Sequence, residues 1–302
     1  MGKSLPGETV FVDKVFATRY NEIRKQNFLE EENSMIERMI PSFDGTQLYM
    51  KKEVAEGNKA IVVIVHGLCE HQGRYDYFAE KLHAAGYGTY RFDHRGHGRS
   101  QGDLPHYDSY HEILDDTNVV VDMAIAENPD VSVFLLGHSM GGFAVSLFGA
   151  KYPGKKLKGI VTSGAAVCDT IGLFAGAPDG LDPKTQLPNE LGGGVCSVAE
   201  VVDWYGKDPY NKKAYTIGLV YALKAGQKWF SESMKTFEYP VFMTHGEKDG
   251  LVGMDDSVIF FKNAPAADKT LKVYGNLFHE ILNEYCKDDV IADMIGWMDA
   301  RI

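Results

Sequence analysis

The chain has 302 residues, of which 44% are hydrophobic and 24% charged, which is an ordinary globular composition. This length exceeds the roughly 100–200 residues usual for one domain, so we expect a core domain with an insertion. The formal net charge of -11 argues against nucleic acid or an anionic membrane surface as the main partner, because a phosphate-binding surface needs concentrated lysine and arginine.

The cysteines and the N-terminal residues indicate in which cellular compartment the protein is expected. The four cysteines are scattered and form no C-x-x-C pair, which favours free thiols over a disulfide framework. Residues 1–11, MGKSLPGETVF, lack the apolar core of a signal peptide, and no stretch approaches the roughly 20 apolar residues of a membrane-spanning helix. We expect a cytoplasmic protein without stable membrane insertion, and we assign residues 1–33 to an N-terminal extension in which one helix is expected.

Short apolar runs then alternate with amphipathic segments. Residues 34–57 predict two strands joined by a turn at Asp44-Gly45, which would form an antiparallel edge of a sheet. The run AIVVIVHG (60–67) is continuously apolar, as expected for a strand buried on both faces. Further strands are predicted over residues 87–98, 131–139, 157–166, 239–249 and 269–276, and helices over residues 74–86, 115–129 and 141–153. This alternation predicts an α/β fold with a mostly parallel, twisted sheet and helices on both faces.

The alternation stops between about residues 165 and 237. This stretch contains a glycine- and proline-rich segment and two helical segments, with little strand character. We therefore predict a core made of residues 34–164 and 238–302. A helical cap, residues 165–237, is inserted after the sixth strand.

The pentapeptide Gly137-His138-Ser139-Met140-Gly141 links a predicted strand to a predicted helix. Small residues around a serine are common by chance, and a structural turn with an incidental serine is the alternative. In a strand–turn–helix context, however, this pattern is typical of a nucleophile elbow, which presents the serine hydroxyl at a helix N-terminus. We therefore take Ser139 as the candidate nucleophile.

A serine nucleophile needs a histidine base. Of the ten histidines, His279 follows the last predicted strand and is the strongest candidate. His138 is expected to point away along the turn. The remaining histidines near glycine-rich strand ends are expected to shape their loops: His66, His94 and His97.

The base in turn needs a carboxylate to orient it. Asp249 follows the strand before the last one, in a glycine-punctuated loop. Glu247 and Asp255 are competing acids, each expected to be a surface charge. The chain order Ser139, Asp249, His279 is the order of a Ser-Asp-His triad in α/β sheets.

Two backbone N–H groups are required to stabilise the negative charge that develops on the substrate oxygen. One is expected from Met140, directly after the nucleophile. The other is expected from the loop after residues 60–67, where Leu68 is best placed. A structural role for Leu68 in a tight turn is the alternative.

Four segments carry a resemblance to the monoacylglycerol lipase/lysophospholipase-like group of the α/β-hydrolase family, which is of the serine aminopeptidase S33 type. They are HGLCEHQGRYDYFAEKLHAAGYGTYRFDHRGHGRSQGD (66–103), LLGHSMGG (135–142), HGEKD (245–249) and FHEILNE (278–284). The resemblance covers the chain from about residue 35 to the C-terminus and is weakest in the predicted cap.

The resemblance implies an α/β-hydrolase fold with a helical cap over an apolar acyl pocket and with no cofactor or metal. It also implies Ser139, Asp249 and His279 as the triad, with Leu68 and Met140 as the oxyanion donors. Relatives of this group often carry a small residue at the first oxyanion position. Leu68 departs from that pattern, which bears on the shape of the pocket and on the preferred chain length.

Glu70 and Arg74 lie four residues apart, just after the first predicted oxyanion donor. In a helical segment they would share one face. A surface ion pair is one interpretation. The other, which the resemblance favours, is a polar niche that binds the hydroxylated alcohol part of a substrate.

Together these features predict a serine esterase for small lipid esters, with a small-molecule substrate, transient contact with lipid and an undetermined oligomeric state. Monoacylglycerols or lysophospholipids are the first expectation. Short-chain or hydroxycinnamoyl esters would suit the same triad. A catalytically inactive, ligand-binding α/β-hydrolase fold is the alternative from another class.

Overall fold

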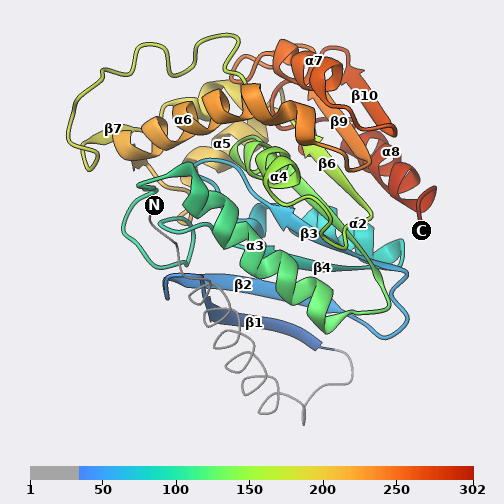
Figure 1. Ribbon diagram of the computed structural model, residues 1–302. Helices are drawn as coiled ribbons and strands as arrows, with labels where there is room; N and C mark the ends of the chain where they lie inside the picture. The colour runs from blue at the N-terminus through green and yellow to red at the C-terminus, as the bar shows by residue number, and fades with distance from the viewer. Residues whose placement is uncertain (1–33) are drawn as a thin grey trace, which may run out of the picture. The chain divides into compact units, whose positions relative to one another are not determined.

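The computed structural model of the protein describes residues 34–302 (Figure 1), so the predicted N-terminal extension and its helix lie outside the described residues. Residues Met35–Ile302 form one compact unit. Every helix within residues 34–302 is too short or too polar to cross a membrane.

The centre of the fold is an eight-stranded sheet with the strand order β1-β2-β4-β3-β5-β6-β9-β10. Its strands are β1 (Ser34–Pro41), β2 (Gln47–Val54), β3 (Ala60–Val65), β4 (Tyr87–Phe92), β5 (Ser132–His138), β6 (Gly159–Ser163), β9 (Val241–Gly246) and β10 (Lys269–Tyr274). Strand β2 is antiparallel to β4, whereas the neighbours from β4 to β10 pair in parallel. The predicted mostly parallel sheet is confirmed.

Strand β3 shows that both faces of the sheet are covered. All six of its residues are buried. Its odd-numbered residues, among them Ile61, join one core cluster, and its even-numbered residues, among them Val62, join a second cluster on the other face. This alternation explains the continuous apolar run in the sequence, because side chains of a strand point to opposite faces in turn.

Helices cover both faces, as predicted. The first cluster receives residues from α3 (Tyr110–Glu127), α4 (Met140–Lys151) and α7 (Met254–Asn263), and the second from α2 (Asp76–Ala84) and α8 (Lys287–Asp299). A 3-10 helix, η1 (Gln72–Tyr75), precedes α2. The carboxyl ends of the parallel strands therefore remain free for a site at one edge of the sheet.

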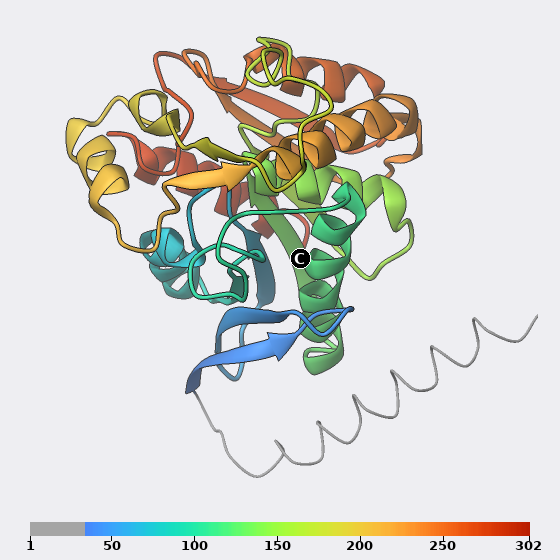
Figure 2. The ribbon, with the colours of Figure 1, turned by 90° about the vertical axis from the view of Figure 1, so that its left-hand side faces the viewer.

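Residues 165–237 contain the remaining elements. They are β7 (Gln186–Pro188), η2 (Leu191–Gly194), α5 (Ala199–Lys207), β8 (Ala214–Thr216), α6 (Ile217–Ser233) and η3 (Met234–Thr236). Figures 1 and 2 show α5, α6 and the β7–β8 pair on the opposite side of the fold from β1 and β2. Helix α6 contributes Leu219, Leu223 and Phe230 to the first core cluster, so this element packs into the core. The division into a core and a separate cap stays a prediction.

Candidate active site

The turn between β5 and α4 holds Ser139 in a strained conformation. Its φ of 56° and ψ of -116° lie in a region that residues with a side chain rarely adopt. The turn requires glycine at positions 137 and 141, where a side chain would clash with the backbone. A Cβ on Gly137 would lie 2.2 Å from the carbonyl oxygen of Gly141, and one on Gly141 would lie 2.0 Å from that of Val65. The glycines of the pentapeptide are therefore required by close backbone packing, and Ser139 stands at the tip of an elbow.

His279 and Asp249 form a buried pair after β10 and β9. His279 Nδ1 lies 2.7 Å from Asp249 Oδ2. Because an ionised carboxylate can only accept, Nδ1 carries the proton, and the lone pair of the neutral ring is on Nε2. The backbone N–H groups of Leu251 and Val252 also donate to Asp249, at 2.9 and 2.8 Å, and hold the carboxylate in place.

The electrostatics of this pair favour a charged acid beside a strong base. Burial would raise the pKa of Asp249, but His279 and His245 outweigh it and lower the pKa below its usual range. Burial would lower the pKa of His279, but the charge and hydrogen bond of Asp249 outweigh it and raise that pKa. This is the pattern expected of a histidine base with an orienting carboxylate.

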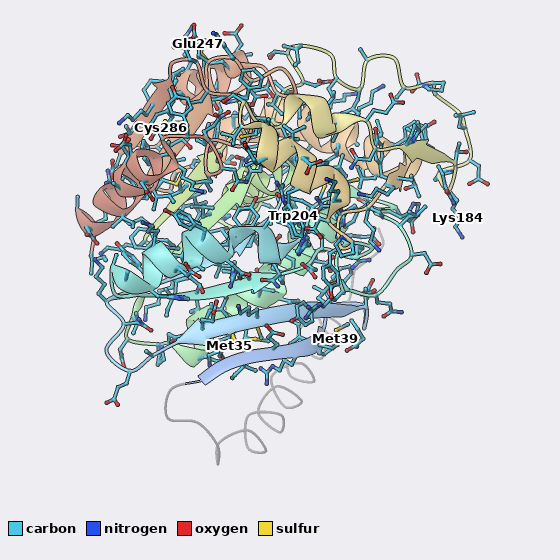
Figure 3. The ribbon with its side chains drawn as sticks, turned by 180° about the vertical axis from the view of Figure 1, so that it is seen from behind. Met35, Met39, Lys184, Trp204, Glu247 and Cys286 are labelled. Carbon is cyan, nitrogen blue, oxygen red and sulfur yellow. The ribbon has the colours of Figure 1, made fainter. Side chains whose placement is uncertain are left out.

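The two competing acids do not reach His279. Glu247 is exposed (Figure 3) and accepts a hydrogen bond from the backbone N–H of Asn276. Asp255 is exposed in the first turn of α7. Both are surface charges, as predicted.

A cavity at the carboxyl ends of β3, β5, β6 and β9 brings the candidate residues together. Its empty volume is about 490 Å³, counting the part that opens to solvent, and both Ser139 and His279 line it. Within residues 34–302 the Ser139 hydroxyl makes no hydrogen bond to His279. Such contacts are often loose before substrate binds, so the arrangement is compatible with proton transfer between the two residues.

The two expected oxyanion donors also border this cavity. Leu68 and Met140 are both among its lining residues. Their backbone N–H groups donate to no acceptor within residues 34–302. For Met140 this follows from its place in the first turn of α4, where the N–H groups of a helix lack an internal partner and the helix dipole favours negative charge.

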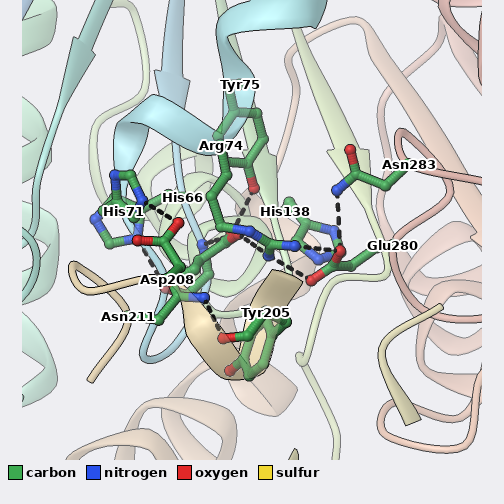
Figure 4. A network of polar contacts seen from close by, with 12 residues as sticks. His66, His71, Arg74, Tyr75, His138, Tyr205, Asp208, Asn211, Glu280 and Asn283 are labelled. Atoms are coloured by element: carbon green, nitrogen blue, oxygen red, sulfur yellow. Dashed lines mark hydrogen bonds and ion pairs between the residues drawn. The ribbon is translucent and has the colours of Figure 1, made fainter. Parts of the chain in front are cut away.

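Glu70 and Arg74 form an ion pair that is buried, so the interpretation as a surface pair is wrong. Arg74 Nη1 donates to Glu70 at 2.8 Å and to Glu280 at 2.5 Å, and Nη2 donates to Glu280 at 2.8 Å. The guanidinium also lies 5.0 Å from the ring of Tyr205, a residue of α5 (Figure 4). We call Glu70, Arg74 and Glu280 the ion-pair network. Sequence reasoning missed Glu280, although it directly follows His279.

A second cavity also borders this network. Its empty volume is about 330 Å³. Its lining residues are Glu70, Arg74, Tyr75, Tyr77, Phe78, His138, Glu280, Leu282 and Asn283. The two cavities thus share a polar wall formed by Glu70, Glu280 and His138.

The prediction that His138 points away along the turn is wrong, because it lines both cavities and its ring lies 4.6 Å from that of His279. The expectation for the other three histidines is confirmed. The backbone N–H of His94 donates to His66 at 2.9 Å, and the ring of His97 packs 5.2 Å from that of His66. These buried rings connect the loops after β3 and β4.

The rest of the cavity wall is apolar and comes mainly from residues 165–237. The lining residues of this kind include Leu173, Phe174, Leu191, Val195, Leu223, Leu251 and Val252. Leu191 belongs to the 3-10 helix η2, whose glycine-rich sequence has no apolar period that would have indicated this contribution. Within residues 34–302 no group of three or more acidic, histidine or cysteine side chains could hold a metal ion.

Comparison with known proteins reveals similarity over most of the chain. A family model described as "Serine aminopeptidase, S33" matches residues 56–285. The monoacylglycerol lipase of Mycolicibacterium smegmatis is 33% identical over 81% of this chain and 89% of its own length. The monoglyceride lipase of Homo sapiens is 29% identical over 85% of this chain and 88% of its own. The crystal structure of Paleococcus ferrophilus monoacylglycerol lipase matches with a TM-score of 0.75 at 27% identity, over 84% of this chain and 99% of that one.

Proposed function

The chain belongs to the hydrolase family described as serine aminopeptidase S33, and on this basis we propose that it is a serine carboxylester hydrolase that cleaves small lipid esters. Monoacylglycerols or lysophospholipids are the proposed substrates, because lipases of monoacylglycerols are among its relatives over most of their length. One observation carries the proposal: Ser139, on a strained turn, shares a cavity with His279, which is hydrogen-bonded to the buried Asp249.

In the proposed mechanism Ser139 Oγ attacks the ester carbonyl carbon while its proton passes to His279 Nε2. Asp249 stabilises the imidazolium that results. The N–H groups of Leu68 and Met140 bind the oxygen as it becomes negative. When the tetrahedral intermediate collapses, the bond to the alcohol oxygen breaks and His279 protonates that oxygen. Water then attacks the acyl-enzyme, with His279 again taking the proton, and the acid is released.

The two kinds of cavity wall suit the two halves of such a substrate. We assign the apolar wall, with Phe174 and Leu223 as members, to the acyl chain, because each buried CH₂ contributes about 0.8 kcal/mol. We assign the wall formed by the ion-pair network to the hydroxylated alcohol. The carboxylates of Glu70 and Glu280 make this wall polar, and Arg74 holds both in place.

The test is the replacement of Ser139 by alanine. Ser139→Ala is expected to abolish hydrolysis of p-nitrophenyl and glyceryl esters while leaving thermal unfolding close to that of the wild type. Ser231→Ala, an exposed serine on α6, is the matched control and should keep full activity. Retained turnover in Ser139→Ala would overturn the mechanism. Comparing short-chain, long-chain and feruloyl esters on the wild type identifies the acyl group, and inactivity on all of them would indicate a ligand-binding fold.

A further inference from the structure

His138, the residue before Ser139, borders both cavities. It is 5% exposed, yet its side chain lines both of them. Its ring lies 4.6 Å from that of His279, centroid to centroid. Figure 4 shows it beside Arg74 and Glu280. The proposed mechanism gives this side chain no role.

The hydrogen bonds of His138 determine which ring nitrogen carries the proton. Nδ1 lies 3.1 Å from both the backbone carbonyl oxygen and the hydroxyl of Ser163. Because a carbonyl oxygen can only accept, Nδ1 is the donor, and Nε2 of the neutral ring is an acceptor. Burial, together with the nearby His279, lowers the pKa of His138 to about 3. The ring therefore stays neutral, and Nε2 stays an acceptor, throughout the neutral pH range.

This nitrogen is open to a ligand. Within residues 34–302 Nε2 has no hydrogen-bond partner, and it is not among the buried side-chain atoms that lack one, so it is accessible from a cavity. The neighbouring carboxylates are more heavily engaged. Glu70 accepts from Arg74 and Tyr75, and Glu280 accepts twice from Arg74. Of the polar groups on the shared wall, His138 offers the acceptor with no existing partner.

We propose that His138 binds the leaving alcohol: its Nε2 accepts a hydrogen bond from a hydroxyl group next to the scissile ester. The inference rests on the proposed function, in which His279 protonates the departing alcohol oxygen. Because the rings of His138 and His279 are in contact, a hydroxyl one or two carbons from that oxygen lies on the side of the cavity where His138 stands. The enzyme is then selective for esters of diols and triols over esters of simple alcohols.

The experiment compares 2-hydroxyethyl decanoate with n-propyl decanoate. The two esters share the acyl chain, and their alcohols differ in one hydroxyl in place of a methyl group. The measured quantity is the ratio of kcat/KM for the two esters. The wild type should prefer the hydroxyethyl ester by about tenfold, the effect of one hydrogen bond of about 1.4 kcal/mol.

The variant His138→Phe keeps a ring and loses the acceptor, so its ratio is expected to fall to about one. His111→Phe is the matched control: it makes the same replacement at an exposed histidine of α3 and should keep the wild-type ratio. If His138→Phe fails to fold in a thermal unfolding assay, His138→Met takes its place, with the same expected ratio. The ratio is informative because a purely structural defect would slow both esters alike.

The outcomes separate this inference from the proposed function. Hydrolysis of both esters with a wild-type ratio near one overturns the role of His138 and leaves the proposed function standing. A tenfold preference that is retained in the His138 variant also overturns the role of His138 and leaves the proposed function standing. A wild type that hydrolyses neither ester overturns the proposed function, and the role of His138 with it.

Discussion

Replacing Arg74 with methionine would remove the cation that lies between two buried carboxylates. The side chains of Arg74, Glu70 and Glu280 are only 5%, 5% and 4% exposed, and three hydrogen bonds join them. Removing one partner of a buried ion pair costs about 3–5 kcal/mol, because the charge left behind is neither paired nor solvated. We therefore expect Arg74→Met to lower the free energy of unfolding by about 3–5 kcal/mol at pH 7.

The loss should depend on pH in a defined direction. Burial alone would raise the pKa of Glu70, but Arg74 and its other partners outweigh burial and lower it from 4.5 to about 2. Because the pKa is lower in the folded than in the unfolded state, this carboxylate stabilises the wild type above the unfolded pKa. That contribution disappears as the pH falls through the folded pKa. The difference between wild type and variant is therefore largest near pH 7 and shrinks below about pH 4.

Urea unfolding followed by circular dichroism at pH 7 and at pH 3 measures both effects. The control is Lys207→Met, which removes a lysine whose partner Asp203 is also exposed and which should unfold close to the wild type. If Arg74→Met loses no more stability than this control, the buried network does not stabilise the fold in the way described. A difference that grows as the pH falls would contradict the direction of the pKa shift.

The other predictions concern the pair after β9 and β10 and the elbow. Asp249→Asn should lower kcat by about 10³–10⁴-fold in steady-state assays, because an amide no longer fixes the proton on His279 Nδ1; a loss below tenfold would contradict this role. Since His279 must be neutral to accept a proton and its pKa is raised, kcat/KM should increase with pH through an inflection above 6.5, and a flat profile would contradict the assignment. Gly141→Ala places a Cβ 2.0 Å from the carbonyl oxygen of Val65 and should cost at least about 3 kcal/mol in thermal unfolding. Gly206→Ala, with open space around its Cβ, should cost nothing, and equal stability of the two variants would refute the packing argument.

The core strands could be predicted because burial on both faces leaves a continuous apolar run that ends at glycine. Strand β3 is buried along its whole length, as its sequence indicates. Ser139, Asp249 and His279 could be singled out for a related reason, since each follows a predicted strand and the carboxyl ends of parallel strands meet at one edge. The strands β7 and β8 have three residues each, too few for a pattern to emerge.

The polar wall of the cavity was harder to predict. Glu280 lies 206 positions from Arg74 in the sequence. The local sequence pattern after His279 does not indicate which side chain points toward that cation. Burial of the ion-pair network was equally hidden, because a spacing of four residues describes an exposed pair as well as a buried one. For His138, the orientation depends on the contact between its Nδ1 and Ser163, a residue of the neighbouring strand β6. Contacts of this kind, between residues far apart in the chain, cannot be inferred from a single sequence.

Labelling with a fluorophosphonate tests the central claim most directly, because the reagent reacts with an activated serine and leaves a stable adduct. Intact-mass and peptide-mapping mass spectrometry of the labelled wild type should find one adduct, on Ser139, and ester hydrolysis should fall in proportion to the labelled fraction. An adduct on another residue, or full hydrolysis by completely labelled protein, would contradict the assignment of Ser139 as the nucleophile.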